Sequence, residues 1–340
     1  MKRSIALAAL ATLASGTALA QSTVTVYGRL NVSVERQKTE TTDGESGLKT
    51  TDSIWALQNS SSRIGFKGWE DLGGGLKAGF LIEHGFNPDT GAASGGAAGF
   101  WGRESWVGLE GGFGKLRLGN MGPTAAYFAT ADYISMHNHD TGTSSDAFYL
   151  YPGNVKNTIA YQTPSFSGFQ AEVQLGLKET NADNTKNTFV LAGNYDAGPL
   201  HLGAGYVNAP LDTTAMTGDA KEFGVRGLYE LGAFTVGAYF INNKTNDNAG
   251  TERKRNAFRV SAMYAMGPNE FHVNVGKAGK IKENGTTLDG TDATQYTLAY
   301  NYNLSKRTKV YAFYTALSGD GRELYTSLKN SFALGVRHNF

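Results

Sequence analysis

The sequence predicts an all-β fold, a barrel of sixteen antiparallel strands. Three observations lead to this prediction: the composition, the two-residue alternation of apolar and polar side chains, and the regular spacing of connections. The chain of 340 residues contains 44 Gly, 18 Phe and 17 Tyr, but only 7 Pro and no Cys. This profile is typical of many strands joined by tight turns.

Alternation is clearest at the two ends of the mature chain. Between residues 23 and 35, one predicted face of the strand carries Val24, Val26, Gly28, Leu30, Val32 and Val34. The opposite face carries polar and aromatic side chains, and the last residues, 332–340, alternate in the same way. A period of two with one apolar face indicates strands that separate an apolar environment from a wet one.

Connections predict the strand count. Seven short turns are expected at residues 70–75, 111–114, 163–168, 196–199, 230–233, 266–270 and 303–308. Eight longer polar connections alternate with them, at residues 36–53, 87–99, 120–153, 180–186, 208–218, 242–254, 280–289 and 318–327. Fifteen connections join sixteen strands and place every long loop at one end. This is the layout of a transmembrane barrel of the bacterial outer membrane, whereas a soluble β-sandwich or soluble barrel would not need such asymmetry.

The first twenty residues differ from the rest. Lys2 and Arg3 precede an apolar run, and small residues stand before Gln21, so we expect residues 1–20 to be a cleaved signal peptide and residues 21–340 to form the barrel domain. Removing the two basic residues changes 31 basic against 30 acidic residues to 29 against 30. This near neutrality gives no reason to expect a nucleic acid partner.

Charged residues gather on the predicted polar face of several strands. They are Arg29, Arg63, Lys67, Lys77, Glu83, Arg103 and Lys156. Any one of them can be read as a solvated charge on a barrel wall. As a set that converges from neighbouring strands, they predict a local potential that selects ions in a water-filled lumen.

The connection at residues 120–153 is the longest and lacks sustained alternation. A segment of this length inside a compact fold is typical of a functional loop. It carries Asp132, Asp140 and Asp146, which we expect to face the basic wall.

Aromatic residues near strand ends predict the interfacial girdles of a membrane barrel. They are Phe66, Trp69, Trp106, Tyr229, Tyr296, Tyr300, Tyr302 and Phe340.

Catalytic and metal sites are poorly supported. His137 and His139 lie close in sequence to several serines, but no nucleophile-elbow pattern surrounds these serines. Two loop histidines without further clustered ligands are weak evidence for a metal site. We therefore predict no catalytic residue, no metal site and no cofactor.

Several segments resemble the general porins of Gram-negative outer membranes, especially those of β-proteobacteria. The resemblance covers essentially the whole chain and is strongest in VTVYGRLNV, SSRIGFKGWEDLGGGLKAGFLIEHGF, RESWVGLEGGFGKLRLGN, NTIAYQTPSFSGF and the terminal ALGVRHNF. It implies a homotrimer in which the third external loop folds into the lumen, with a basic ladder on the facing wall.

Carried over by position, the resemblance assigns Arg29, Arg63 and Arg103 to the ladder and Asp132 to the loop acids, with Lys156 a weaker match. The loop motif Pro-Glu-Phe-Gly-Gly-Asp of enteric relatives is absent, so the acidic partners are left open. The resemblance also implies that Phe340 is part of the signal read by the outer-membrane assembly machinery. Phe340 is equally well explained as a girdle aromatic.

The predicted function is a passive diffusion channel in the outer membrane for ions and small hydrophilic solutes, without enzymatic activity. Because three matched arginines outnumber the one placed loop acid, we expect a weak preference for anions. The expected partners are outer-membrane lipids, the assembly machinery, further copies of the chain, and the permeating ions and solutes. Two alternatives remain: a substrate-specific channel, and a β-barrel enzyme of the outer membrane.

Overall fold

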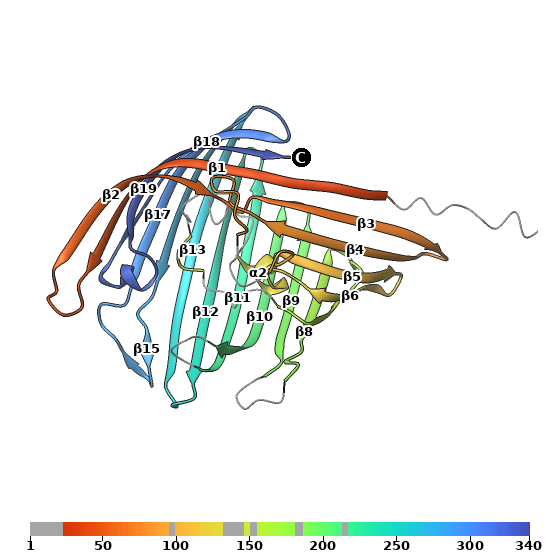
Figure 1. The fold of residues 1–340 in the computed structure, drawn as a ribbon, viewed down its shortest axis with the longest axis horizontal. Coiled ribbons are helices and arrows are strands. Elements are labelled where there is room, and N and C mark those ends of the chain that lie inside the picture. Colours follow the sequence, from red (N-terminus) through yellow and green to blue (C-terminus); the bar gives the residue numbers. More distant parts are fainter. Residues whose placement is uncertain (1–22, 95–98, 132–145, 150–154, 181–185, 213–216) are drawn as a thin grey trace, which may run out of the picture.

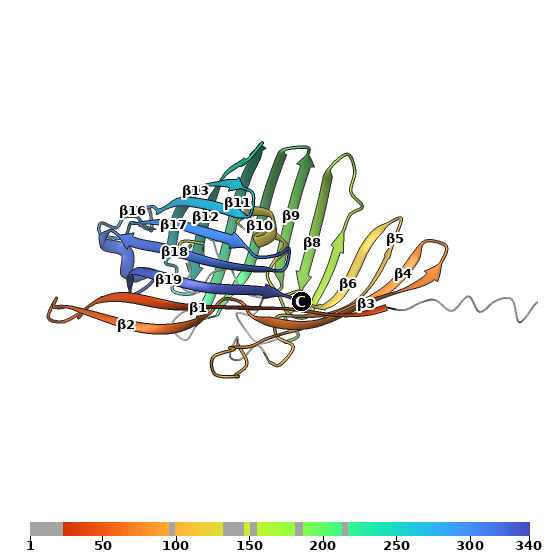
Figure 2. The same cartoon turned by 90° about the horizontal axis from the view of Figure 1, so that it is seen from above.

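The computed structural model describes residues 23–94, 99–131, 146–149, 155–180, 186–212 and 217–340. Within this part of the chain, the strands form one continuous antiparallel sheet that closes on itself (Figure 1). β1 closes the barrel, because it pairs with β19 on one side and with β3 on the other (Figure 2). The predicted antiparallel barrel is confirmed.

The first half of the sheet consists of β1 (Thr23–Thr42), β2 (Lys49–Asn59), β3 (Arg63–Gly73), β4 (Leu76–Gly85), β5 (Glu104–Gly111), β6 (Gly114–Asn120), β7 (Thr158–Gln162), β8 (Phe169–Gly176) and β9 (Thr188–Ala197). The second half consists of β10 (Leu200–Asp212), β11 (Thr217–Leu231), β12 (Phe234–Asp247), β13 (Glu252–Met266), β14 (Asn269–Ala278), β15 (Lys282–Glu283), β16 (Thr286–Thr287), β17 (Ala293–Asn303), β18 (Thr308–Ser318) and β19 (Leu328–Asn339). Two short helices complete the described elements: α2 (Ala125–Thr130) and the 3-10 helix η2 (Asp320–Leu324).

Nineteen strand segments make up a barrel of sixteen strands. β2 and β3 both pair with β1 and are separated by three residues, so they are two parts of one broken strand. β15 and β16 form a small hairpin within an external loop. The seven short turns lie where the sequence predicts them. No helix in the described ranges has the length and apolar character that crossing a membrane requires.

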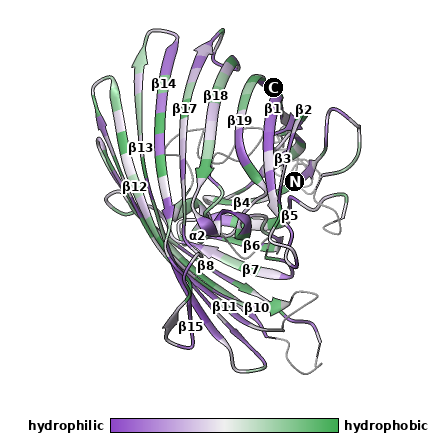
Figure 3. Cartoon of the chain, turned by 90° about the vertical axis from the view of Figure 1, so that its left-hand side faces the viewer, coloured by the Kyte–Doolittle hydropathy of each residue, from purple (hydrophilic) through white to green (hydrophobic). Residues whose placement is uncertain are grey.

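Hydrophobic and hydrophilic residues alternate along many strands (Figure 3), and the two faces of the barrel differ in polarity. Apolar side chains on the outer face, such as Val26, Leu298 and Leu334, are about half exposed, whereas inward side chains such as Asn31, Glu35 and Gln295 are fully buried. A continuous apolar outer face matches a lipid environment, and a closed barrel satisfies every backbone hydrogen bond there.

The strands on the side of the long loops continue further than the sequence predicts. Residues 36–53 were expected to be a loop, but β1 and β2 stay paired as far as Thr42 and Lys49. β10 and β11 likewise remain paired to Asp212 and Thr217. Backbone pairing does not require an apolar face outside the lipid, so polar segments without alternation still extend the ladder.

The girdle prediction is wrong for two tryptophans. Trp69 and Trp106 occupy inward strand positions, with their ring centroids 5.9 Å apart. Trp106 Nε1 donates a hydrogen bond to Glu104 Oε1 at 2.5 Å. Indole is amphipathic, so a tryptophan near a strand end suits either face. Tyr229, Tyr296 and Phe340 are exposed on the outer face, as predicted.

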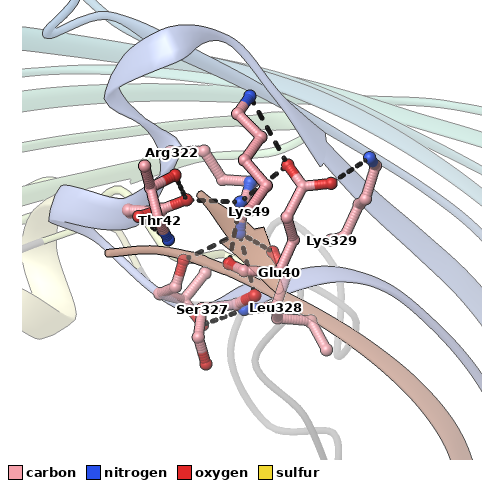
Figure 4. A network of polar contacts seen from close by, with 9 residues as sticks. Glu40, Thr42, Lys49, Arg322, Ser327, Leu328 and Lys329 are labelled. Atoms are coloured by element: carbon pink, nitrogen blue, oxygen red, sulfur yellow. Dashed lines mark hydrogen bonds and ion pairs between the residues drawn. The ribbon is translucent and has the colours of Figure 1, made fainter. Parts of the chain in front are cut away.

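An ionic network joins the first and last strands at the external rim (Figure 4). Arg322 of η2 is buried and donates hydrogen bonds to the carbonyl oxygens of Ser327 and Glu40. The carboxylate of Glu40 also accepts a hydrogen bond from Lys329 Nζ at 2.6 Å. Arg322 therefore fastens the last external loop over the seam where the barrel closes.

Candidate pore constriction

Three arginines gather on one part of the inner wall, as the sequence predicts. Arg29 lies on β1, Arg63 begins β3, and Arg103 immediately precedes β5. Residues 29 and 63 face each other across the β1–β3 ladder. We call Arg29, Arg63 and Arg103 the arginine wall.

Glu83 on β4 holds two of these arginines. Its Oε1 lies 2.7 Å from Arg103 Nε, and its Oε2 lies 3.4 Å from Arg63 Nε. The Tyr27 hydroxyl also donates a hydrogen bond to Oε2, at 3.0 Å. The arginine side chains remain 23% and 28% exposed. Glu83 therefore positions cationic groups that still face water.

Arg29 is more buried than the other two arginines. Its Nε lies 3.4 Å from Asn339 Oδ1 on β19, so its guanidinium is next to the seam between the first and last strands. Lys67 points inward as predicted, but lies over the ring of Tyr27 at 5.0 Å from the centroid.

Lys156 precedes β7 and has an exposed side chain, and its place beside the arginine wall stays a prediction. The strand alternation that places Arg63 does not extend to residue 156, because strand pairing begins only at Thr158.

Loop 3, residues 121–157, connects β6 to β7, and its described helix α2 lies inside the barrel (Figure 3). Its first limb contains α2, which contacts β8 to β12 on the inner wall. The buried hydroxyl of Thr124 caps this helix by accepting a hydrogen bond from the Tyr127 amide at 3.2 Å, as is typical of an N-cap residue.

Glycines on β10 allow the close approach of α2. A Cβ atom at Gly203 would lie 1.8 Å from the carbonyl oxygen of Ala129, and one at Gly205 would lie 2.7 Å from the Ala126 side chain. Only a residue without a side chain fits at position 203. The two glycines of β10 thus leave room for α2 against the inner wall.

The second limb of loop 3 is fixed by a buried ion pair. Asp146 Oδ1 lies 2.9 Å from Arg259 on β13, and both side chains are 0% exposed. The Asp146 carboxylate also accepts hydrogen bonds from the Phe148 amide and the Tyr239 hydroxyl. Gln295 on β17 accepts from both Arg259 and the Ala147 amide. We call Asp146, Tyr239, Arg259 and Gln295 the loop anchor.

Asp146 therefore does not face the arginine wall, contrary to prediction. Its carboxylate points to β13, where Arg259 supplies the counter-charge that a buried carboxylate requires. Next to Asp146 in the loop, Phe148 is buried as well. Phe148 is completely buried among Ala257, Ala278 and Leu317 of the inner wall. Burial of one phenylalanine contributes about 1.5–3 kcal/mol. Asp132 and Asp140, together with His137 and His139, lie outside the described residues.

Two important arginines, Arg117 and Arg259, are not among the residues that the sequence singles out. Arg117 on β6 lies 2.5 Å from Glu172 and 3.9 Å from Glu104. It alternates with Leu116 and Leu118, so the rule that found Arg63 would also have found Arg117. Alternation equally places Arg259 inward, but its partner Asp146 is 113 residues away. No sequence pattern connects the two.

Together, the fold and the site define a class of protein. A closed barrel has an apolar outer face and a polar interior, and a loop fixed inside it narrows the lumen. This is a membrane pore. Among the described residues, no group of three or more histidines, aspartates or glutamates is placed to hold a metal ion.

Comparisons with known proteins identify the family. A family model described as Gram-negative porin matches residues 6–322. Outer membrane porin protein 32 of Delftia acidovorans is 32% identical, over 99% of this chain and 95% of that relative. Major outer membrane protein P.IB of Neisseria sicca is 28% identical, over 97% and 98% of the two chains. The chain belongs to the Gram-negative porin family and is a passive diffusion channel of the outer membrane.

Solved structures agree with this assignment. The anion-selective porin from Comamonas acidovorans has a TM-score of 0.73 at 26% identity, covering 94% of this chain and all of that one. OmpT of Vibrio cholerae in its trimer form has a TM-score of 0.69 at 20% identity, covering 94% and 99%. The second likeness shows the fold alone.

Proposed function

We propose that this channel prefers anions and that the arginine wall sets the preference. The observation that carries the proposal is the convergence of Arg63 and Arg103 on the single carboxylate of Glu83, with Arg29 beside them. Among these four side chains three are cationic and one is anionic, and the carboxylate of Glu104, across the ladder from Glu83, lies 3.9 Å from a further arginine, Arg117. Where a loop displaces bulk water, such an excess attracts anions and repels cations.

A relative supports the sign of this preference. The structurally similar porin from Comamonas acidovorans is described as anion-selective. Asp132 and Asp140 are proposed to face the same wall and to limit the preference. Lys67 and Lys156 are proposed to add positive potential on either side of the constriction.

The experiment that tests this proposal is a reversal-potential measurement across a planar bilayer under a salt gradient. Arg29, Arg63 and Arg103 are each changed to Ser, and Arg307→Ser in an exposed turn is the control. We expect the three wall variants to lose part of the anion preference and the control to retain it. Unchanged reversal potentials in all three variants would refute the assignment of these residues, and absence of conductance would refute the channel itself.

Four further features belong to the same proposal. The chain works as a homotrimer, consistent with the trimer form of the OmpT that shares its fold. Residues 1–20 are a cleaved signal peptide. Phe340, whose amide and carbonyl pair with Gly28, is part of the assembly signal. The protein is not an enzyme, which protease and lipase assays of the purified barrel would test.

An aromatic track along the pore wall, which would guide the solute of a substrate-specific channel, has no comparable support. Tyr27 and Phe313 face the interior. Phe313 stacks with Tyr311 and is buried, however, so it offers no exposed surface on which a solute would slide.

A further inference from the structure

A recess of about 360 Å³ lies between α2 and the inner wall formed by β5 to β9. Its apolar side belongs to loop 3 and consists of Met121, Pro123, Ala125 and Phe128. The ring of Phe128 is 39% exposed, although it belongs to a loop packed inside the barrel. The volume of the recess is within the range of small-molecule sites, which is roughly 300–1,000 Å³.

The charges that line this recess are already paired. Arg117 bonds to Glu172 at 2.5 Å and lies 3.9 Å from Glu104, and Lys115 lies 3.1 Å from Glu110. Two cations and two carboxylates line the recess itself, so it carries no net charge. A charged solute would have to break these pairs in order to bind, which disfavours it.

Neutral amides on the same wall keep hydrogen-bonding capacity. The Asn194 side chain makes no hydrogen bond to any described residue, and Gln170 uses only one donor, toward the Thr163 carbonyl at 3.2 Å. The side-chain amide of Gln162 donates to Glu172 at 3.1 Å, and the side-chain oxygen Oε1 of Gln162 accepts no hydrogen bond from a described residue. Amides offer donors and acceptors side by side, which is what hydroxyl groups require.

We propose that this recess is a binding site for a neutral, hydroxyl-rich ring such as a monosaccharide. The apolar side under α2 would cover the C–H face of the ring, while Asn194, Gln170 and Gln162 bond its hydroxyls. Lys115, Gln170 and Asn194 lie within a few residues of the short turns that end their strands. The recess is therefore within reach of a solute that enters from the short-turn end of the barrel. This inference rests on the proposed channel function.

The test uses D-glucose as the probe on single channels in a planar bilayer, added to the side of the short turns. We expect a saturable reduction of ion current in the native channel. In Asn194→Leu and Gln170→Leu, the half-saturating concentration should rise about fivefold, the effect of losing one hydrogen bond. A polyethylene glycol of similar mass, with fewer hydroxyl donors, should give only a non-saturating reduction.

Thr235→Leu is the matched control, because Thr235 is an inward polar residue near the start of β12, away from the recess. It should retain the native glucose response. Normal conductance without saturable block, or equal block in the native channel and both amide variants, would overturn the site while leaving the channel function intact. Loss of conductance in the native protein would instead refute the channel function.

Discussion

The arginine wall and the loop anchor use the same chemical groups for different ends. In the anchor, one guanidinium meets one carboxylate, and both are completely buried. In the wall, Arg63 and Arg103 share the carboxylate of Glu83 and stay about one quarter exposed. The anchor is neutral and dry, so it fixes a backbone. The wall has excess positive charge next to water, so it creates a field.

This difference shows that burial and stoichiometry, rather than residue type, decide what an arginine does in a barrel. A charge buried with one partner has no effect on a passing ion, because its field is neutralised locally. Removing its partner is costly, since an unpaired charge remains in a dry site. Removing a partly exposed charge costs little folding stability and changes ion partition directly.

The largest effect is expected from Arg259→Met, which leaves the Asp146 carboxylate buried without its counter-charge. We expect the free energy of unfolding in urea to fall by about 3–5 kcal/mol, and single-channel conductance to spread over several levels as loop 3 is released. Arg253→Met on the same strand is the control, because the ion pair of Arg253 with Glu283 is 40% and 34% exposed. Its effect should stay below about 1 kcal/mol.

Changing both partners sharpens the same comparison. Arg259→Met combined with Asp146→Leu replaces the buried pair by apolar groups, so it should recover part of the lost stability. A double variant no more stable than Arg259→Met would show that the amide contacts of Asp146, rather than its charge, hold the loop.

The next effect is expected from Glu83→Gln, which removes the negative charge of the arginine wall. One unit charge at 4 Å in water is worth about 1 kcal/mol, so the anion-to-cation permeability ratio should rise by up to about fivefold. The rise should shrink with increasing salt. Glu110→Gln, on β5 close to its turn, should change the ratio much less, and equal shifts would contradict a localised wall.

A smaller effect is expected from Thr124→Ala at the N-cap of α2. Loss of the hydrogen bond to the Tyr127 amide should cost about 1 kcal/mol. Because the helix has only six residues, amide exchange at Tyr127 should accelerate and open-channel noise should increase. Thr124→Ser keeps the hydroxyl and should behave like the native channel, so noise in this variant would point to packing instead of capping.

The smallest effect is expected at the external rim, outside both regions. Hydrogen bonds from Thr42 lower the pKa of the Glu323 carboxyl. A carboxyl with a lowered folded-state pKa stabilises above its unfolded pKa, and this contribution is lost as pH falls through the folded pKa. The Thr42 amide, which donates to Glu323 at 3.0 Å, should lose exchange protection only as the pH falls below 4.5, the ordinary pKa of a glutamate carboxyl, after correction for intrinsic rates.

The Glu40 amide provides an internal control for this measurement. It donates to the carbonyl of Ser327 at 2.9 Å, which does not titrate in this range. Its protection should stay constant, and Glu323→Gln should remove the pH dependence at Thr42. Parallel loss at both amides would indicate opening of the whole rim.

Much of the barrel follows from local patterns. A strand in lipid must show an apolar side chain at every second position, so the alternation between Val24 and Val34 reveals the inward direction of Arg29, and the alternation in the following strands does the same for Arg63 and Glu83. Short turns are also local features. Where strands leave the lipid, this constraint ends, and the paired segments up to Thr42 and Asp212 were therefore read as loops.

The sequence by itself determined the sixteen strands, the outward and inward faces, and the residues of the arginine wall. Only the tertiary structure decided that Asp146 pairs with Arg259 and that Trp69 and Trp106 turn inward. These outcomes depend on which segments meet across the lumen. Such contacts join residues far apart in the chain, and their energy comes from burial and charge pairing that no local period encodes.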